Sequence, residues 1–356
     1  MKNKNYNILM TIPHTKGGGI VSFCNALTPF FPNVDFIKRG VKDGVKSRIK
    51  IIIDLLEDYV NFIKILFKKK YDIIFVNASL SKIGCIRDGI QIFIAKVLRK
   101  KVLLYIHGFE EEQLEKKWLC KGFLLADVIV VLAEEFREKI KKYGFKRQIY
   151  VSFNPVDKNI VDAVSKSDIE KRINKRITNI LFIARIEMDK GIIITLKIFK
   201  LLKRKYSWLK LYVAGIGSAL NEAKDFVKNN SIDDVYFLGL VAGKEKINLF
   251  VNSDILLFPT FHKEGLPINV LESMVVGMPV ITRAIGGIKD FFQDNEIGYL
   301  VESLEPEDFI IKIENLMNSQ NYARISNNSY YFGQTHFHPK IVASNLEKII
   351  DLVVNH

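Results

Sequence analysis

The stretch that decides the fold is Asp254-Ile-Leu-Leu-Phe-Pro-Thr-Phe-His-Lys-Glu264-Gly-Leu-Pro-Ile-Asn-Val-Leu-Glu272-Ser-Met-Val-Val-Gly277-Met-Pro-Val-Ile-Thr-Arg-Ala-Ile-Gly-Gly-Ile-Lys-Asp290. Ile255–Phe258 is a short apolar run that ends at a proline, which predicts a buried strand. Pro267 suits the first turn of a helix, and Gly277 suits its end. Val280–Thr282 predicts the next strand. The stretch is therefore a strand, loop, helix and strand, the repeating unit of a parallel sheet.

Two acidic side chains lie near the start of the predicted helix. Glu264 is in the loop and Glu272 is inside the helix. We expect the N–H groups of Gly265, Leu266 and Ile268, together with the helix dipole, to form an anion site. Carboxylates beside a bound anion can accept hydrogen bonds from hydroxyl groups, and a nucleotide sugar supplies both. An ordinary structural unit with solvated glutamates explains this stretch equally well.

Size and composition indicate a two-domain globular protein. The chain has 356 residues, of which 48% are hydrophobic, enough for two cores. Cys24, Cys85 and Cys120 show neither metal-site nor redox spacing and are typical of buried thiols in a reducing compartment. The N-terminus leads directly into a predicted strand, so we expect no secretory signal. No uncharged run has transmembrane length.

The net charge of +14 is concentrated in the first half of the chain. Residues 1–155 contain 28 Lys and Arg against 15 Asp and Glu, whereas residues 156–356 contain 25 against 24. Such a basic half can face nucleic acid, anionic lipid or an acidic substrate, or can serve only solubility. Polar side chains recur at helical spacing between Arg48 and Lys70 and form one stripe, which predicts a surface helix with a wide apolar face.

Strands and helices alternate along the whole chain, which predicts two parallel sheets covered on both faces. Asn154-Pro155-Val156-Asp157 interrupts the alternation, and a polar stretch without strand character continues to Arg176. We therefore predict a first domain at 1–155, a second at 156–335, and a final helix at 336–356 that packs back on the first domain.

Ligands bind at the carboxyl ends of strands in such sheets. Gly17-Gly18-Gly19 follows the first predicted strand, and His107 ends another. A tight turn explains the glycines as well as a ligand does, and His107 also suits packing. In the second half, Arg185 and Lys190 follow one predicted strand, and the Gly215-Ile-Gly217 turn follows the next. Two cations at a diphosphate would neutralise the charge that develops on a leaving group.

This ordered set resembles the retaining GT-B glycosyltransferases of glycosyltransferase family 4, over nearly the whole chain. The most specific part is Glu264 to Glu272, which is similar to the family's paired-glutamate motif with seven residues between the acids. Ala184–Gly191 is similar to its arginine–lysine phosphate loop. Further similarities lie in Gly17–Gly19, His107, the hinge at Asn154, and the two glycine stretches at 214–217 and 286–287. The sequence departs from the family at Gly108 and Ile216, where acidic residues are frequent.

The resemblance implies two Rossmann-like domains that face each other across a cleft, and it implies residue roles. Arg185 and Lys190 would hold the donor diphosphate, and Glu272 the ribose hydroxyls. Glu264 and His107 would contact the donor sugar. The remaining donor-site residues implied are glycines and neighbours that let backbone approach the ligand: Gly18, Gly19, Gly215, Gly217, Gly265, Leu266 and Pro267. The family transfers sugars without a metal or other cofactor, and a front-face mechanism is usually proposed for it.

The implied activity is transfer from a nucleotide-diphosphate sugar, with a UDP sugar favoured, to a glycan or lipid-linked glycan of bacterial surface polysaccharide or lipopolysaccharide. The basic first half and the helix near 46–70 lead us to expect a cytoplasmic enzyme held peripherally on an anionic membrane surface. Packing of that helix on the sheet explains its apolar face equally well. A nucleotide-sugar 2-epimerase of the same fold and a basic nucleic-acid-binding protein remain alternatives. The aromatic residues are not interleaved with the basic ones as a nucleic-acid stacking surface requires.

Overall fold

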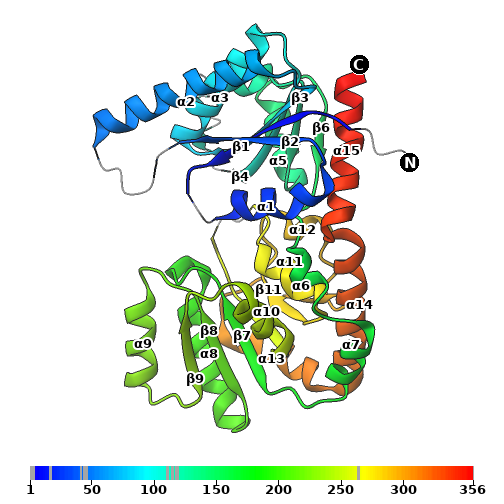
Figure 1. Ribbon diagram of the computed structural model, residues 1–356. Coiled ribbons are helices and arrows are strands. Elements are labelled where there is room, and N and C mark those ends of the chain that lie inside the picture. Colours follow the sequence, from blue (N-terminus) through cyan, green and yellow to red (C-terminus); the bar gives the residue numbers. More distant parts are fainter. Residues whose placement is uncertain are drawn as a thin grey trace. The chain divides into compact units, whose positions relative to one another are not determined.

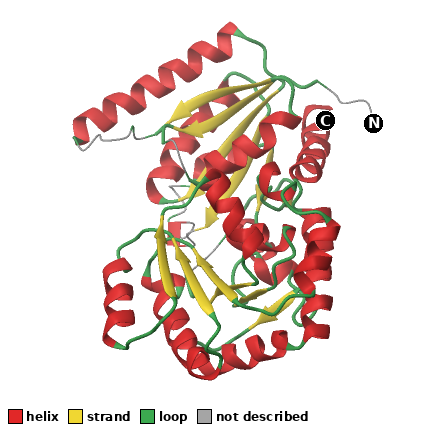
Figure 2. Ribbon diagram, turned by 60° about the horizontal axis from the view of Figure 1, so that its bottom comes forward, coloured by secondary structure: helices red, strands yellow, loops and turns green. Residues whose placement is uncertain are grey.

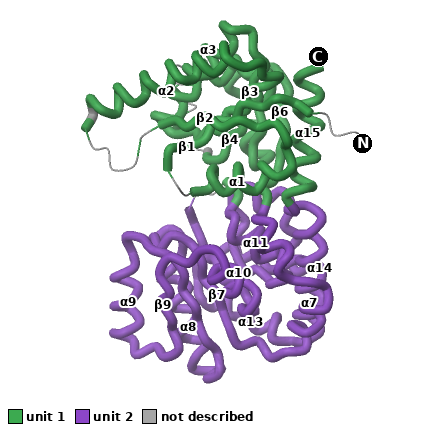
Figure 3. Tube along the Cα trace, viewed as in Figure 1, with its two compact units in different colours: residues 1–155, 264–266, 339–356 green, residues 156–263, 267–338 purple. Residues whose placement is uncertain are grey.

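The computed structural model describes residues 5–15, 18–40, 42, 47–109, 112–113, 116, 120–262 and 265–355 (Figure 1). The chain forms two compact units (Figure 3). Unit 1 comprises Met1–Pro155, Glu264–Leu266 and Pro339–His356. Unit 2 comprises Val156–Lys263 and Pro267–His338.

Unit 1 is built on a six-stranded parallel sheet with the strand order β2-β1-β3-β4-β5-β6. Its elements are β1 (Ile8–Pro13), α1 (Gly19–Leu27), η1 (Thr28–Phe30), β2 (Val34–Arg39), α2 (Arg48–Lys68), β3 (Ile73–Leu80), α3 (Lys82–Val97), β4 (Val102–Phe109), η2 (Lys121–Leu125), β5 (Val128–Val131), α5 (Glu134–Lys142), β6 (Ile149–Val151) and α15 (Pro339–Asn355).

The C-terminal helix α15 belongs to unit 1, although it is far from the rest of that unit in sequence. It packs beside α1, and its Asp351 carboxylate accepts a hydrogen bond from the Tyr6 hydroxyl. The chain therefore leaves unit 2 at its end and returns to the unit in which it began.

Unit 2 repeats this combination of strands and helices (Figure 2). Its sheet is parallel, with the strand order β12-β11-β10-β7-β8-β9. Its elements are α6 (Lys158–Val161), α7 (Lys166–Ile173), β7 (Asn179–Ile183), η3 (Met188–Lys190), α8 (Ile192–Lys205), β8 (Lys210–Ala214), α9 (Leu220–Asn229), β9 (Val235–Gly239), α10 (Gly243–Asn252), β10 (Ile255–Phe258), α11 (Ile268–Val275), β11 (Val280–Thr282), α12 (Ile288–Phe291), β12 (Gly298–Leu300), α13 (Pro306–Met317) and α14 (Ser319–His336).

The prediction of two parallel α/β sheets is confirmed, and so is the unit at 254–290. Ile255–Phe258 is a fully buried strand, α11 follows it, and Gly277 adopts a left-handed φ of 65° just past the helix end. Pro267 differs slightly from expectation, because it precedes the helix in an extended conformation instead of lying in its first turn.

The polar stretch to Arg176, which the sequence marked as lacking strand character, forms the helices α6 and α7. Asp157 caps the first through the N–H of Asn159 at 2.8 Å, and Ser165 with Asp168 forms a capping box at the second. Such caps stabilise helices that are too short to form by propensity alone. Buried Arg172 then fastens α7 to the rest of unit 2. Its guanidinium donates to the carbonyl oxygens of Phe250, Val251 and Val276.

The surface helix expected near 48–70 is present as α2. Within its polar stripe, however, Asp54 and Asp58 are buried. They are buried because they find partners: Asp54 accepts from Lys42 at 2.9 Å, and Asp58 accepts from the N–H of Gly40 at 2.8 Å. The sequence also predicts a helix at 110–125, of which residues 110–111, 114–115 and 117–119 lie outside the described residues and Lys121–Leu125 is the 3-10 helix η2.

Two glycines allow the loops after β7 and β8 to meet at the carboxyl edge of the second sheet. Gly215 has a φ of 136°, and a Cβ placed there would lie 1.9 Å from the carbonyl oxygen of Ala184. A Cβ on Gly217 would lie 2.3 Å from the carbonyl oxygen of Ile186. The N–H of Ile186 in turn donates to the carbonyl of Ile216 at 3.0 Å. The glycines therefore hold one loop against the other, whatever they do for a ligand.

We predict that Gly215→Ala lowers the free energy of unfolding by about 3 kcal/mol or more, because the methyl group meets backbone that cannot move aside. The matched control is Gly239→Ala, which also has a positive φ, of 70°, but open space around the new Cβ. The control should lose only about 1–2 kcal/mol. Urea denaturation of both variants measures the difference, and equal losses would contradict the packing account.

Candidate active site

The loop after β7 carries the two cations that the sequence singled out. Arg185 is exposed, whereas Lys190 is buried in η3. Gly191 follows with a left-handed φ of 85°, and an added Cβ there would lie 2.4 Å from the carbonyl oxygen of Pro259. The close approach fixes the end of the cation loop against the loop that follows β10.

Asp189 joins these two loops more firmly. Its carbonyl oxygen accepts hydrogen bonds from the N–H groups of Phe261 at 2.8 Å and His262 at 3.0 Å. Its carboxylate lies 2.5 Å from Nδ1 of His262. This contact joins two residues that are 73 positions apart in the chain. Glu264, the first glutamate of the pair, lies outside the described residues.

Glu272 is buried in α11 with its two carboxylate oxygens in different surroundings. Oε1 accepts a hydrogen bond from Nζ of Lys246 at 2.6 Å. Oε2 is buried and has no hydrogen-bond partner among the described residues. Burial raises the pKa of the Glu272 carboxyl above its ordinary value, against the opposing effect of Lys246. A hydroxyl donor at Oε2 would offset the desolvation cost of this buried oxygen.

Lys246 is a residue that the sequence analysis missed. It lies on α10, which precedes the stretch 254–290, and it belongs to no sequence motif. Its side chain is 27% exposed, so one end of the ion pair reaches solvent while the other is buried. By holding Oε1, Lys246 fixes the carboxylate plane and leaves Oε2 for another donor.

Asn269 fastens the start of α11 to the end of β7. Its Nδ2 donates to the carbonyl oxygen of Ile183 at 2.8 Å, and its Oδ1 accepts from the N–H of Val270 at 2.9 Å. Ile183 is two residues before Arg185. The helix that carries Glu272 is therefore tied to the strand that carries the cation loop, and β10, β7 and β8 are neighbours in the sheet.

His107 lies in unit 1, where its protonation state is fixed by its neighbours. Nδ2 of Asn77 donates to the carbonyl oxygen of Thr11 at 2.9 Å, so Oδ1 of Asn77 must face the histidine, 2.8 Å from Nε2. Because Oδ1 only accepts, Nε2 carries the proton and Nδ1 is left as an acceptor. Burial lowers the pKa of His107 to about 3, with a smaller effect from Arg39. The ring is therefore neutral at physiological pH.

The glycine loop of unit 1 is described from Gly18 onward. Gly18 precedes α1 with a φ of 110°, and an added Cβ at Gly18 or Gly19 would meet nothing within 4 Å. The positive φ at Gly18 is thus a backbone requirement, and the space beside the loop is open. Gly17 lies outside the described residues.

Gly265 and Leu266 group with unit 1, whereas Pro267 groups with unit 2. Within unit 1, an added Cβ on Gly265 would lie 2.9 Å from the carbonyl oxygen of His107. Nδ2 of Asn154 donates to the carbonyl oxygen of Leu266 at 3.4 Å. The structure thus places Gly265 and Leu266 beside the strand end that carries His107, and places Arg185, Lys190, Gly215, Gly217 and Glu272 together along the carboxyl edge of the second sheet.

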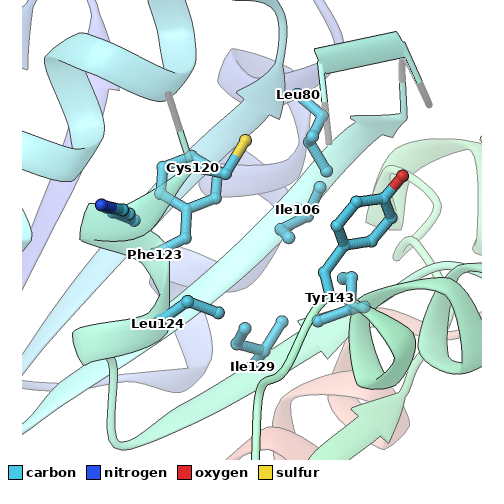
Figure 4. Close-up of a pocket in the computed structure, with 9 residues that line it drawn as sticks. Leu80, Ile106, Cys120, Phe123, Leu124, Ile129 and Tyr143 are labelled. Carbon is cyan, nitrogen blue, oxygen red and sulfur yellow. The ribbon is translucent and has the colours of Figure 1, made fainter. Parts of the chain in front are cut away.

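A separate apolar cavity of about 150 Å³ lies in unit 1 (Figure 4). Leu80, Ile106, Phe123 and Tyr143 line it together with Cys120, whose Sγ is 3.2 Å from that of Cys85. None of the predicted site residues lines this cavity. Among the described residues, no cluster of three or more His, Cys, Asp or Glu side chains is arranged to hold a metal ion.

Comparison with known proteins identifies the enzyme class. Residues 164–331 match the family model of glycosyl transferases group 1. The capsular polysaccharide biosynthesis glycosyltransferase CapM of Staphylococcus aureus is 26% identical over 332 residues, which cover 83% of this chain and 82% of CapM.

Two solved structures share the fold over almost the whole chain. A glycosyltransferase from Rickettsia africae ESF-5 aligns with a TM-score of 0.77 and 16% identity, over 99% of each chain. HepE of Anabaena, solved in complex with UDP and glucose, aligns with a TM-score of 0.73 and 14% identity, over 97% of this chain and 99% of HepE. The GT-B fold expected from the sequence is thereby confirmed. The protein is a glycosyltransferase, and its residues 164–331 are the part that matches the group 1 family model.

Proposed function

We propose that the protein is a retaining, metal-independent glycosyltransferase that takes its sugar from a UDP sugar. The observation that carries the proposal is the buried carboxylate of Glu272, which keeps one oxygen on Lys246 and offers the other to a ligand. A ribose presents two neighbouring hydroxyl groups as donors. UDP bound to HepE supports the choice of nucleotide.

The diphosphate would lie against the loop after β7, where Arg185 and Lys190 supply positive charge. Arg185 is exposed and able to form a forked pair with phosphate oxygens, while Lys190 acts as a compact charge at the base of the loop. As the bond between the sugar C1 and the diphosphate oxygen breaks, negative charge builds on that oxygen. Two fixed cations stabilise this charge, which is the task that a metal performs in other transferases.

In the front-face mechanism, the acceptor hydroxyl attacks C1 from the side that the diphosphate leaves. The new C1–O bond forms as the old one breaks, and the acceptor proton passes to the departing phosphate oxygen. Neutral His107 takes no proton in this scheme. Its Nδ1 accepts a hydrogen bond from a sugar hydroxyl, and Glu264 contacts the same sugar.

The acceptor we propose is a glycan or a lipid-linked glycan in the synthesis of bacterial surface polysaccharide or lipopolysaccharide. The likeness to CapM, a capsular polysaccharide glycosyltransferase, supports this acceptor class. The acceptor would bind in unit 1, because residues 1–155 carry nearly all of the net positive charge and a basic surface attracts an acidic substrate.

We predict that Arg185→Ala and Lys190→Ala each abolish sugar transfer to an accepted glycan, because each removes charge stabilisation from the leaving diphosphate. Lys197→Ala, on the exposed side of α8, is the matched control and should retain wild-type turnover.

Transfer measured in EDTA should equal transfer with added Mg²⁺ or Mn²⁺. Full turnover in either loop variant, or dependence on a metal, would refute the proposed phosphate chemistry. Nuclear magnetic resonance of the product should show the donor's anomeric configuration.

We also predict that Glu272→Gln is more stable than wild type at pH 8 but binds UDP more weakly. Burial raises the pKa of the folded carboxyl above its ordinary value of 4.5, so the ionised form costs folding free energy above that folded pKa. This cost shrinks as the pH falls toward 4.5 and the wild-type carboxyl takes up a proton. Glutamine carries no such cost at any pH.

Denaturation midpoints at pH 8 and pH 5, with calorimetry of UDP binding, measure both effects. Glu245→Gln, an exposed neighbour on α10, is the control and should change neither. A Glu272→Gln protein that is less stable than wild type at pH 8 would show that the Lys246 pair outweighs burial.

A further inference from the structure

Helix α2 presents an apolar stripe to solvent. Its exposed apolar residues follow each other at intervals of one, three or four positions and therefore lie along one side of the helix. They are Ile49, Ile52, Ile53, Leu56, Val60, Ile63 and Phe67, with Phe67 75% and Ile49 73% exposed. Single exposed apolar residues are ordinary, but a continuous stripe over the length of a helix indicates a contact surface.

Helix α3 carries a second stripe of the same kind. Its exposed apolar residues are spaced by three and four positions throughout: Ile83, Ile86, Ile90, Phe93 and Val97. Val97 is 63% exposed and Phe93 56%. The sequence predicted an apolar face for α2 alone, and α3 adds a second exposed apolar stripe.

Both stripes point away from the same face of the first sheet. Phe62 and Leu66 of α2 and Ile92 of α3 are buried in one hydrophobic cluster, together with side chains from that face of the sheet. The two helices contact each other, and the Tyr59 hydroxyl donates to the carbonyl oxygen of Arg87 at 3.4 Å. They therefore form one layer, as Figure 1 shows above β1 and β2. We call the two exposed stripes the outer apolar face.

The charges around the outer apolar face are sorted by sign. The acids Asp54, Asp58 and Asp88 are turned inward and are at most 4% exposed. Glu57 is the exposed acid among the described residues of these two helices. The exposed basic residues on the helices and just beyond their ends are Lys50, Lys64, Lys68, Lys69, Lys70, Lys82 and Arg99. Of these, Lys69 pairs with Asp35 at 2.6 Å. The surface is therefore apolar with a basic surround.

We propose that the outer apolar face docks on an anionic lipid bilayer, with the apolar side chains entering the interface and the lysines contacting lipid headgroups. The apolar residues match the lipid interface, and the basic residues around them match its anionic headgroups. A second copy of this chain would instead bring like charges together, which opposes self-association. No helix of the described residues is long and apolar enough to cross a bilayer, and the proposed helices lie along its surface.

Docking would hold unit 1 at the membrane, where a lipid-linked acceptor presents its sugar. This consequence for the acceptor rests on the proposed function, whereas docking itself does not. The two can fail separately, since vesicle binding needs no donor and UDP binding needs no vesicle.

The test is co-sedimentation of the full-length protein with vesicles of phosphatidylglycerol and phosphatidylethanolamine, or of phosphatidylcholine alone. We expect binding to the anionic vesicles, weaker binding in high salt, and little binding to the neutral ones. The triple variant Ile52→Ser, Leu56→Ser, Phe67→Ser should lower the partition coefficient roughly tenfold or more. Ile90→Ser with Phe93→Ser should lower it through α3. UDP binding by all variants should stay at the wild-type level.

The matched control is Leu240→Ser with Ile311→Ser, which removes two apolar side chains of unit 2 that are 74% and 54% exposed. This control should bind vesicles as wild type does. Absence of wild-type binding to anionic vesicles at low salt would overturn the proposal, as would equal losses in the control. Self-association that the α2 variant abolishes, seen by sedimentation without vesicles, would assign the face to a second copy and also overturn it.

Discussion

In a parallel sheet every strand delivers its carboxyl end to the same edge, and this constraint decides where the chemistry of the protein can lie. In unit 2 the neighbouring strands β10, β7 and β8 bring three loops to one edge. Asp189 joins the first two through its backbone and side chain, and glycines at 215 and 217 let the third pack against the second. Charged groups far apart in sequence are thereby held on a rigid frame, which electrostatic stabilisation of a leaving group requires.

The burial of the Glu272 carboxylate is the clearest free-energy cost in this arrangement. Glu272 would be more stable as a neutral group, and Lys246 offsets only part of its desolvation. Retaining a charged group in that position makes physical sense if a ligand completes its hydrogen bonding. In unit 1, burial among aromatic rings lowers the pKa of His107 and keeps its ring neutral. Asn77 holds Nε2 and leaves Nδ1 as an acceptor. Glu272 and His107 therefore each present a hydrogen-bond acceptor, a carboxylate oxygen in one case and Nδ1 in the other.

Much of the fold was predictable because local pattern and global topology agree. Short apolar runs such as Ile255–Phe258 are strands, and the glycine at 277 ends α11 where the sequence placed it. The features that the sequence did not predict depend on contacts between residues that are far apart in the chain. In the sequence, Asp54 and Asp58 resemble solvent-exposed residues, but in the structure Lys42 and the N–H of Gly40 satisfy their hydrogen bonds. Helices α6 and α7 depend on their caps rather than on apolar periodicity. The motif residues of the site could be named, but Lys246 could not, because an ion pair between two helices leaves no spacing in the chain.

The central claim, that Glu272 recognises ribose hydroxyl groups, can be measured by comparing UDP with 2′,3′-dideoxy-UDP by calorimetry. The wild-type protein should bind UDP roughly tenfold or more tightly, because a hydrogen bond to a charged group is at stake. Glu272→Gln should bind both nucleotides with nearly equal affinity. An unchanged preference for UDP in the variant would contradict the account, since the hydroxyl groups would then be recognised elsewhere.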